Sequence, residues 1–267
     1  MRTTPCERAC QRNEVISVNA VFQTDIGRVR AHNEDHGGVF YHGDHLCLAV
    51  VADGMGGHNA GDIASRMTIE AMERAWNTSA STIKSSDDAV EWLKSIILVV
   101  NKDILNHANE HSECSGMGTT LVAALCTEKF CTIASIGDSR CYLQSESGFT
   151  QVTEDHSLVN ELVKSGEITR EDAENHPKKN VLTRALGTDE KLIVDYRTIM
   201  FEEDDYLLLC SDGLSNKVTT THMQHVLQSA DSLPLKADTL IQMANENGGE
   251  DNITVVLLEQ CAGSESG

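Results

Sequence analysis

Apolar and polar residues follow two different periods along this chain, and the two periods occur in separate blocks. Two apolar runs, residues 46–52 and 206–211, are each followed directly by an Asp-Gly pair and have the length of buried strands. The first of them is predicted to pair with residues 38–42 as a hairpin across Gly43 and Asp44. Further strands are predicted at residues 15–23, 118–126, 130–136, 140–144, 150–152, 192–198 and 253–258.

Helical spacing occurs in two pairs of segments. The first segment begins near Gly61 and places Met67, Ala71 and Ala75 along one face. The second follows Ser86-Asp87 as a start signal, and its apolar residues recur every three or four positions at Val90, Leu93, Ile97, Val100 and Ile104. Residues 220–230 and 235–246 form the other pair. Strand-rich blocks separated by helix pairs favour a layered α+β fold.

Residues 155–190 differ from the rest of the chain. They are polar, contain short helical pieces, and carry Pro177 followed by the basic pair Lys178 and Lys179. We interpret this segment as an insert beside the functional site. Residues 1–14 are predicted to be a polar N-terminal tail, residues 15–260 the folded domain, and residues 261–267 a C-terminal tail.

Acidic residues follow or precede the predicted strands at positions far apart in the sequence. A carboxylate at the end of a buried strand is costly to desolvate unless a cation meets it, so these residues predict one shared site whose ligands are all oxygen atoms. Such a site suits Mg²⁺ or Mn²⁺ and not zinc. For Asp53 alone, a turn that caps the following helix is an equally good interpretation, because Asp-Gly is common turn chemistry. The acidic residues are Glu34, Asp35, Asp53, Asp138, Asp212 and Asp251.

The composition argues against several classes of protein. A formal net charge of −20 leaves no basic stripe for phosphate backbones, which argues against nucleic acid as a partner. No apolar run reaches the roughly 20 residues of a membrane span, and no signal peptide is expected at the N-terminus. The nine cysteines are odd in number and include no CxxC pair. Because four of them (Cys47, Cys126, Cys131 and Cys210) lie in apolar runs, we expect free thiols and a cytoplasmic location.

Eight short motifs occur together and in a fixed order. They are residues 24–35, 52–58, 118–120, 136–140, 155–158, 182–187, 211–214 and 251–254. On these motifs the chain resembles the PPM (PP2C-type) family of metal-dependent protein serine/threonine phosphatases, in its compact bacterial form. The resemblance extends over roughly residues 15–260.

The resemblance implies a four-layer α-β-β-α sandwich, in which two antiparallel sheets are flanked by helix pairs and residues 155–190 form a flap. It implies hydrolysis of phosphoserine and phosphothreonine in proteins by a hydroxide that bridges two metal ions, opposing bacterial Ser/Thr kinases. The expected cofactors are two tightly bound Mn²⁺ or Mg²⁺ ions and a third, weaker one. The expected partners are phosphoproteins, among them the kinase itself, and the protein is expected to be a monomer with no membrane or nucleic-acid partner.

The resemblance also assigns roles to individual residues. Asp53 would bridge the two metals and take part in catalysis, the Gly54 carbonyl would bind the first metal, and Asp212 and Asp251 would bind the second. Either Glu34 or Asp35 completes the site, and Asp35 is favoured because related bacterial members carry Gln at the Glu position. Asp138 would hold the third ion, sharing Asp212. Arg30 matches the catalytic arginine that binds the substrate phosphate, and its guanidinium fork suits two phosphoryl oxygens.

One position departs from the animal-type pattern. Met55 stands where those enzymes carry a histidine that is proposed as the general acid, and His58 is not a clean substitute for it. The leaving group would then be protonated in another way, for example by a water on the third metal.

Two other functions and two competing motifs are weighed against this interpretation. The chain is alternatively a catalytically silent regulatory module of the same fold, or a phosphatase dedicated to an anti-sigma-factor antagonist. The silent module is disfavoured because Asp53, Asp212 and Asp251 are all present. His107 and His111 have zinc-ligand spacing but are better explained as a solvated helix end. Cys6 and Arg12 match C-x5-R without the strand and glycines that cysteine phosphatases need.

Overall fold

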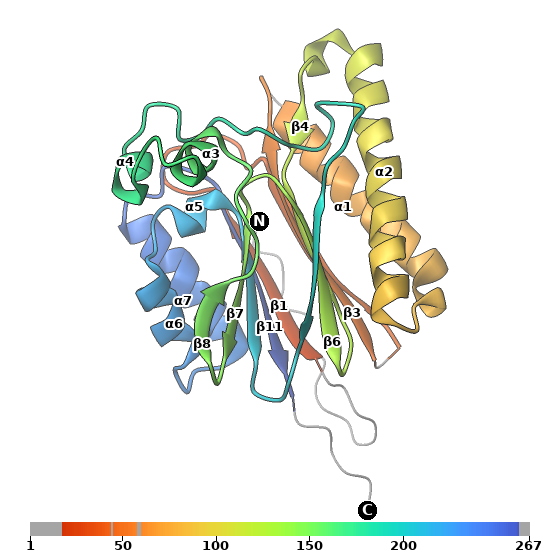
Figure 1. The fold of residues 1–267 in the computed structure, drawn as a ribbon, viewed down its shortest axis with the longest axis vertical. Coiled ribbons are helices and arrows are strands. Elements are labelled where there is room, and N and C mark those ends of the chain that lie inside the picture. Colours follow the sequence, from red (N-terminus) through yellow and green to blue (C-terminus); the bar gives the residue numbers. More distant parts are fainter. Residues whose placement is uncertain (1–17, 44, 58–59, 262–267) are drawn as a thin grey trace, which may run out of the picture.

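The computed structural model describes residues 18–43, 45–57 and 60–261. Two antiparallel sheets lie face to face, and helices cover the outer face of each sheet (Figure 1). The four-layer α-β-β-α sandwich expected from the sequence is therefore confirmed. The predicted N-terminal tail, the C-x5-R motif, His58 and most of the C-terminal tail lie outside the described residues.

Every strand pairing in the two sheets is antiparallel. The first sheet contains, in spatial order, β1 (Val18–Asp25), β11 (Ile253–Gln260), β10 (Tyr206–Cys210), β7 (Arg140–Ser145) and β8 (Gly148–Gln151). The second contains β2 (Asp35–His42), β3 (Leu46–Met55), β5 (Leu121–Cys126), β6 (Phe130–Ile136) and β9 (Asp195–Met200), and the short β4 (Gly118–Thr119) pairs with the end of β3.

Strand β3 shows why its sequence is an unbroken apolar run. Leu48, Val50 and Ala52 pack into the core beneath the helices, whereas Cys47, Ala49 and Val51 pack into the core between the sheets. A strand that is buried on both faces has no polar side, so the alternation of a half-exposed strand is absent. The strand continues to Met55, beyond its predicted end at Ala52, so Asp53 and Gly54 belong to it.

Helices α1 (Ala60–Ser79) and α2 (Ser86–Glu110) cover the second sheet, and α6 (Thr220–Leu227) and α7 (Leu233–Glu246) cover the first. Three single-turn elements complete this set: η1 (Ala80–Thr82), η2 (Ser112–Cys114) and α5 (Asp212–Ser215). The sequence predicted the four long helices, and α6 ends three residues earlier than expected. It missed α5, because four residues are too few to show a helical period.

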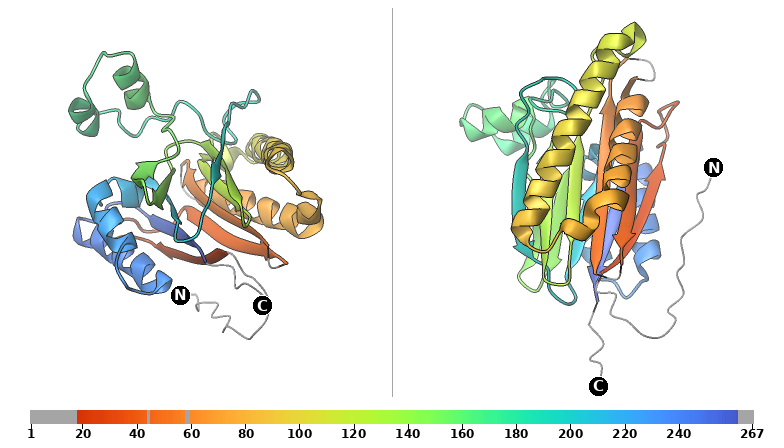
Figure 2. Two further views of the ribbon diagram at one scale, coloured as in Figure 1. Left: turned by 60° about the horizontal axis from the view of Figure 1, so that its bottom comes forward. Right: turned by 90° about the vertical axis from the view of Figure 1, so that its right-hand side faces the viewer.

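The insert is a separate feature at one end of the sandwich. It contains α3 (Leu158–Lys164) and α4 (Arg170–Glu174), and it projects beyond the two sheets in both views of Figure 2. Neither helix contributes a buried residue to the three apolar cores. The insert therefore has the placement expected of a flap, which we keep as its name (residues 155–190).

Two further expectations, free cysteines and no membrane-spanning segment, can be compared with the described residues. Seven cysteines are free thiols there, and six of the seven are buried. Within residues 18–43, 45–57 and 60–261, the helices are too short or too polar to cross a bilayer.

Candidate metal centre

The predicted acidic residues meet at the end of the sandwich that carries the flap. Asp35 is the first residue of β2 and stands directly opposite Asp53 of β3 in the antiparallel register. The backbone of Asp53 is fixed on its other side by Thr120, whose Oγ1 accepts the Asp53 N–H at 3.0 Å and whose N–H donates to the Asp53 carbonyl at 2.9 Å. The two carboxylates are thus placed by strand pairing and not by mobile loops.

Gly54 follows Asp53 at a point where three backbone segments come close together. Its N–H donates to the Glu34 carbonyl at 3.1 Å. A Cβ at this position would lie 2.1 Å from the Gly61 carbonyl oxygen and 2.6 Å from that of Glu34. Only glycine fits, so this position serves through its backbone and not through a side chain.

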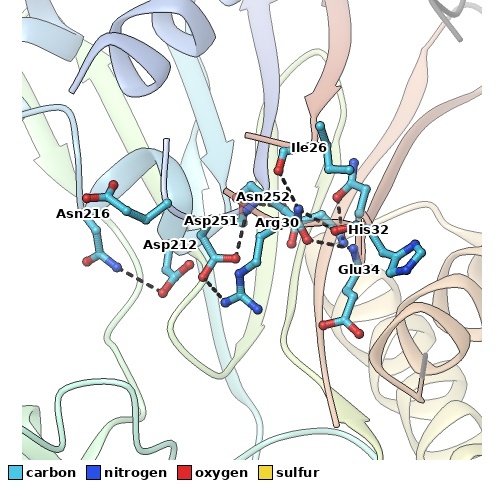
Figure 3. Close-up of polar contacts among 12 residues, drawn as sticks. Ile26, Arg30, His32, Glu34, Asp212, Asn216, Asp251 and Asn252 are labelled. Atoms are coloured by element: carbon cyan, nitrogen blue, oxygen red, sulfur yellow. Dashed lines mark hydrogen bonds and ion pairs between the residues drawn. The ribbon is translucent and has the colours of Figure 1, made fainter. Parts of the chain in front are cut away.

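Asp212 and Asp251 come from the other sheet. Asp212 begins α5 directly after β10, and its Oδ2 accepts a hydrogen bond from Asn216 Nδ2 at 3.0 Å. Ser211, the residue before it, donates its hydroxyl to Asp35 Oδ2 at 2.6 Å and accepts the Thr254 N–H at 3.0 Å. This hydroxyl joins the two sheets across the site. Figure 3 shows Asp212 and Asp251 facing the same space.

Asn252 organises the loop that carries Arg30. Its Oδ1 accepts the Glu34 N–H at 2.8 Å, and its Nδ2 donates to the carbonyls of Ile26 and His32 at 2.9 and 3.0 Å (Figure 3). Asn252 is 4 % exposed, so these bonds are shielded from water. Neither Ser211 nor Asn252 was predicted to have a role in the site. Both residues lie in the motifs at residues 211–214 and 251–254, and each has a polar side chain next to an aspartate at one end of an apolar strand.

Arg30 lies at the mouth of the site. Its Nη2 donates to Asp251 Oδ2 at 2.7 Å, and 48 % of its side chain is exposed. Partial burial lowers the pKa of Arg30, but the hydrogen bond and the charge of Asp251 outweigh it, so the pKa is raised overall. A guanidinium that stays charged here is suited to an incoming anion.

Asp138 lies in the turn between β6 and β7. The next residue, Ser139, places its hydroxyl oxygen 2.7 Å from Thr120 Oγ1, the same hydroxyl that accepts the Asp53 N–H. Asp138 is therefore tied through its neighbour to the strand that carries Asp53.

The carboxylates raise one another's pKa. Burial raises the pKa of Asp35 to about 7, opposed by hydrogen bonds from Ser211 and Thr254. Burial, with repulsion from Asp212, raises that of Asp138 to about 7, and burial, with repulsion from Asp251, raises that of Asp212 to about 6. The pKa of Asp53 is raised well above its usual range by burial and by the four other aspartates. Acids that destabilise one another in this way are stabilised by a cation among them.

The donor set fits a hard divalent cation. Five carboxylates and a backbone carbonyl are oxygen donors, which Mg²⁺ and Mn²⁺ prefer. The side chains converge without closing on one point: in the part of the chain that the structure describes, no group of three or more His, Cys, Asp or Glu side chains is already spaced to hold an ion. Local donors hold them instead, Arg30 on Asp251, Ser211 on Asp35 and Asn216 on Asp212.

The competing zinc motif has a structural explanation. The rings of His107 and His111 stack 4.1 Å apart at the end of α2, and Nδ1 of His111 lies 3.1 Å from the His107 carbonyl oxygen. His111 is the C-terminal cap of the helix. The pair thus ends a helix, which is the explanation that the sequence favoured over a zinc site.

Several named proteins resemble this chain in both sequence and fold. The sequence pattern described as protein phosphatase 2C matches residues 27–256. The chain belongs to the protein phosphatase 2C family. The serine/threonine phosphatase stp of Listeria monocytogenes is 49 % identical over 243 residues, which cover 91 % of this chain and 96 % of that protein. Protein phosphatase PhpP of Streptococcus pneumoniae is 38 % identical over 236 residues, covering 88 % and 94 %.

Solved PP2C-type structures match the whole sandwich. Serine/threonine phosphatase Stp1 from Staphylococcus aureus has a TM-score of 0.87 at 36 % identity and covers 95 % of this chain and 100 % of its own. The catalytic domain of PstP, solved with two manganese ions, has a TM-score of 0.80 at 33 % identity, covering 92 % and 99 %. The predictions of a PP2C-type fold and of a protein phosphatase are therefore confirmed, and neither the silent module nor the dedicated enzyme is favoured.

Proposed function

We propose that this protein hydrolyses phosphoserine and phosphothreonine in proteins with Mn²⁺ or Mg²⁺ as cofactor. The observation that carries the proposal is the convergence of five aspartates, from strand ends of both sheets, beside an exposed arginine. Phosphate esters are dianions, so a site that hydrolyses them must neutralise negative charge. A cluster of acids does so only through bound cations.

The ligands that we assign are the Gly54 carbonyl and the carboxylates of Asp35, Asp53, Asp212 and Asp251. Asp53 lies centrally, opposite Asp35 and within the field of the others, which supports a bridging role between two ions. Asp35 is favoured over Glu34 because Asp35 is buried beside Asp53. When bound, such a pair of ions neutralises the phosphoryl oxygens and acidifies the attacking water. PstP, solved with two manganese ions, is a precedent among the relatives.

Arg30 is assigned to the substrate phosphate. Its guanidinium already donates to an anionic oxygen of Asp251 and retains exposed surface. A phosphoryl group entering the mouth offers the same type of acceptor, with two oxygens for the two arms of the fork. Arg30 then orients the phosphorus toward the space bordered by Asp53 and Asp212.

Asp138 is assigned to a third, weaker ion shared with Asp212. The support is mutual repulsion: the charge of Asp212 contributes to the raised pKa of Asp138, which places the two carboxylates in one field. An ion with few protein ligands keeps most of its waters and binds weakly. The thioether of Met55 has no acidic proton, so the proton for the departing serine oxygen comes from elsewhere in the site.

We assign to the flap the selection of the phosphoprotein substrate. A hydrogen bond from Lys217 lowers the pKa of Glu250, and the charge of Lys179 adds to this effect. Lys179 therefore lies close enough to act on the residue before Asp251. Acidic residues beside the phosphorylated position of a substrate would meet Lys178 and Lys179 at the same edge.

The proposed partners are phosphoproteins, including the kinase that this enzyme opposes. We propose a monomer in the cytoplasm. The six buried free thiols support a reducing compartment, in which thiols persist.

Hydrolysis of p-nitrophenyl phosphate and of Ser, Thr and Tyr phosphopeptides, with and without Mn²⁺, tests the proposed function. We expect turnover that requires the metal and favours phosphoserine and phosphothreonine over phosphotyrosine. Metal-independent turnover, or none with any phosphopeptide, would contradict the proposal.

A further inference from the structure

His156 lies at the neck of the flap, where the chain leaves the sandwich and returns to it. The neck is closed by a bridge between Ser157 and Leu182, and the Thr183 N–H donates to the His156 carbonyl at 2.8 Å. The residue is only 2 % exposed. A buried imidazole needs hydrogen-bond partners for its ring nitrogens, and these partners determine what the ring holds in place.

The two ring nitrogens bind different elements. The Gly137 N–H donates to Nδ1 at 3.1 Å, and the His156 N–H donates back to the Gly137 carbonyl at 2.8 Å. Nε2 lies 3.1 Å from Oδ2 of Asp195, the first residue of β9. Because Nδ1 accepts the hydrogen bond from the Gly137 N–H, the ring hydrogen is on Nε2, which donates to Asp195.

The loop that His156 binds is the loop that carries Asp138. Gly137 has φ +102°, and a Cβ there would lie 2.6 Å from the Thr120 side chain, so the loop is closely packed against Thr120. On the other side of Asp138, the Ser139 hydroxyl is bonded to Thr120, which in turn binds the Asp53 backbone. Asp138 is thus held between Thr120, which joins β4 to β5, and His156 on the flap.

We propose that His156 is a positioning residue: its Nδ1 fixes the Gly137–Ser139 turn so that Asp138 faces Asp212, and its backbone links that turn to the flap. The proposal deepens the proposed function and rests on it only in taking Asp138 as the ligand of the weaker ion. Loss of the imidazole does not release the flap, because Asp155 separately binds Arg140 through three hydrogen bonds of 2.6–3.1 Å. The effect of His156 is therefore expected at Asp138 and not in the attachment of the flap.

Two substitutions separate the two ring nitrogens. In His156→Asn, the Oδ1 atom replaces Nδ1 and still accepts the Gly137 N–H, but the bond to Asp195 is lost. In His156→Gln, the Nε2 atom replaces the ring Nε2 and still donates to Asp195, but the acceptor for Gly137 is lost. Thr169→Ala is the matched control, because it removes the N-terminal cap of α4, which lies in the flap and away from its neck.

Calorimetric titration of the full chain with Mn²⁺ measures the effect on the weakest site. We expect His156→Gln to weaken that site about tenfold, as is typical when a residue that orients a metal ligand is lost. The two tighter sites should be unchanged, and His156→Asn and Thr169→Ala should both match the wild type. Equal losses in His156→Asn and His156→Gln, or wild-type affinity in His156→Gln, would overturn the proposal.

Nuclear magnetic resonance tests the hydrogen bond without metal. The His156 ring should show the Nε2–H tautomer, and the Gly137 amide should exchange slowly with solvent in the wild type and in His156→Asn but faster in His156→Gln. Unchanged exchange in His156→Gln would overturn the positioning role. If the wild type bound only two ions, the proposed third site would fail, and this measurement would still decide the role of His156 in the turn.

Discussion

The metal centre and the flap are neighbours at one end of the sandwich, but they are held in different ways. Asp35 and Asp53 lie on paired strands; Asp35 and its bond to Ser211 are buried, and Asp53 is half-buried. Helix α3 of the flap has no buried residue, and the flap is tied to the sandwich at its two ends. At the neck, His156 binds the Gly137 backbone, and beyond the neck Leu186 and Thr119 exchange backbone hydrogen bonds of 2.8 and 3.0 Å.

This difference suggests a division of work between the two regions. Chemistry that depends on the spacing of several oxygen atoms is placed on rigid strand ends. Recognition of a protein substrate is left to an exposed segment with few internal contacts. Substitutions in the metal centre should therefore affect the hydrolysis of every substrate alike, whereas the effect of substitutions in the flap should depend on the substrate.

The largest effect is expected from Asp53→Ala. With its shared carboxylate removed, we expect kcat to fall by about three orders of magnitude or more for p-nitrophenyl phosphate and phosphopeptides alike. Folding should persist, since removing one acid relieves repulsion among the other aspartates. Steady-state kinetics at saturating Mn²⁺ and thermal unfolding measure both effects. Asp103→Ala on the exposed side of α2 is the control, and near-wild-type turnover of Asp53→Ala would refute the assignment.

Arg30→Ala should act on binding more than on turnover. If the guanidinium holds the phosphate in the ground state, KM should rise by about tenfold or more while kcat falls less, as expected when binding shared by substrate and transition state is lost. Arg28→Ala is a matched control, because it removes an exposed arginine of the same loop. An unchanged KM with a collapsed kcat would show that Arg30 acts only in the transition state.

Metal-free protein should lose stability as the pH rises. Asp35, Asp138 and Asp212 have pKa values raised to between about 6 and 7 in the folded state. Between an ordinary carboxyl pKa and these values the folded chain binds more protons than the unfolded chain, so the free energy of unfolding decreases with rising pH. Thermal unfolding in EDTA should give a lower Tm at pH 8 than at pH 5.

Added Mn²⁺ should restore the Tm at pH 8, because the ion stabilises the ionised form of the acids. Asp35→Asn provides a control that removes one titrating group, and its Tm in EDTA should depend less on pH. A Tm in EDTA that rises from pH 5 to pH 8 would contradict the raised pKa values.

The fold was predictable where buried apolar periods are long. The run at residues 46–52 predicted β3, and the repeat through Val90, Leu93 and Ile97 predicted α2, because burial on one or both faces leaves a clear periodic signal. Strand ends were predicted less accurately, and β9 spans Asp195–Met200 instead of residues 192–198. Pairing partners determine such ends, and they are not local in sequence.

The acidic residues were recognisable because they follow or precede predicted strands at positions far apart in the sequence. Residues that position them were not. Ser211 binds Asp35 from 176 positions away, and Asn252 reaches Glu34 across 218. His156 was visible as part of a motif, but its bonds to Gly137 and Asp195 exist only once two sheets and the flap are assembled. The local sequence pattern indicates which side chains are unusual, whereas tertiary packing determines which groups they bind.

The smallest effect is expected in the flap, from replacing both Lys178 and Lys179 with Glu. Exposed charge pairs contribute little each, so we expect kcat/KM for an acidic phosphopeptide to fall about three- to tenfold. Hydrolysis of p-nitrophenyl phosphate should be unchanged, because a small substrate reaches the aspartates without contacting the flap.

The matched control for this pair is Lys102→Glu with Lys129→Glu, which changes the net charge equally on exposed residues away from the flap. Because long-range repulsion between protein and peptide is the same in both double variants, a loss confined to the flap pair reports local contact. The difference should shrink at high salt, which screens exposed charges. Equal losses on p-nitrophenyl phosphate and phosphopeptide would show that the flap acts on the metal centre itself, and the division between the two regions would fail.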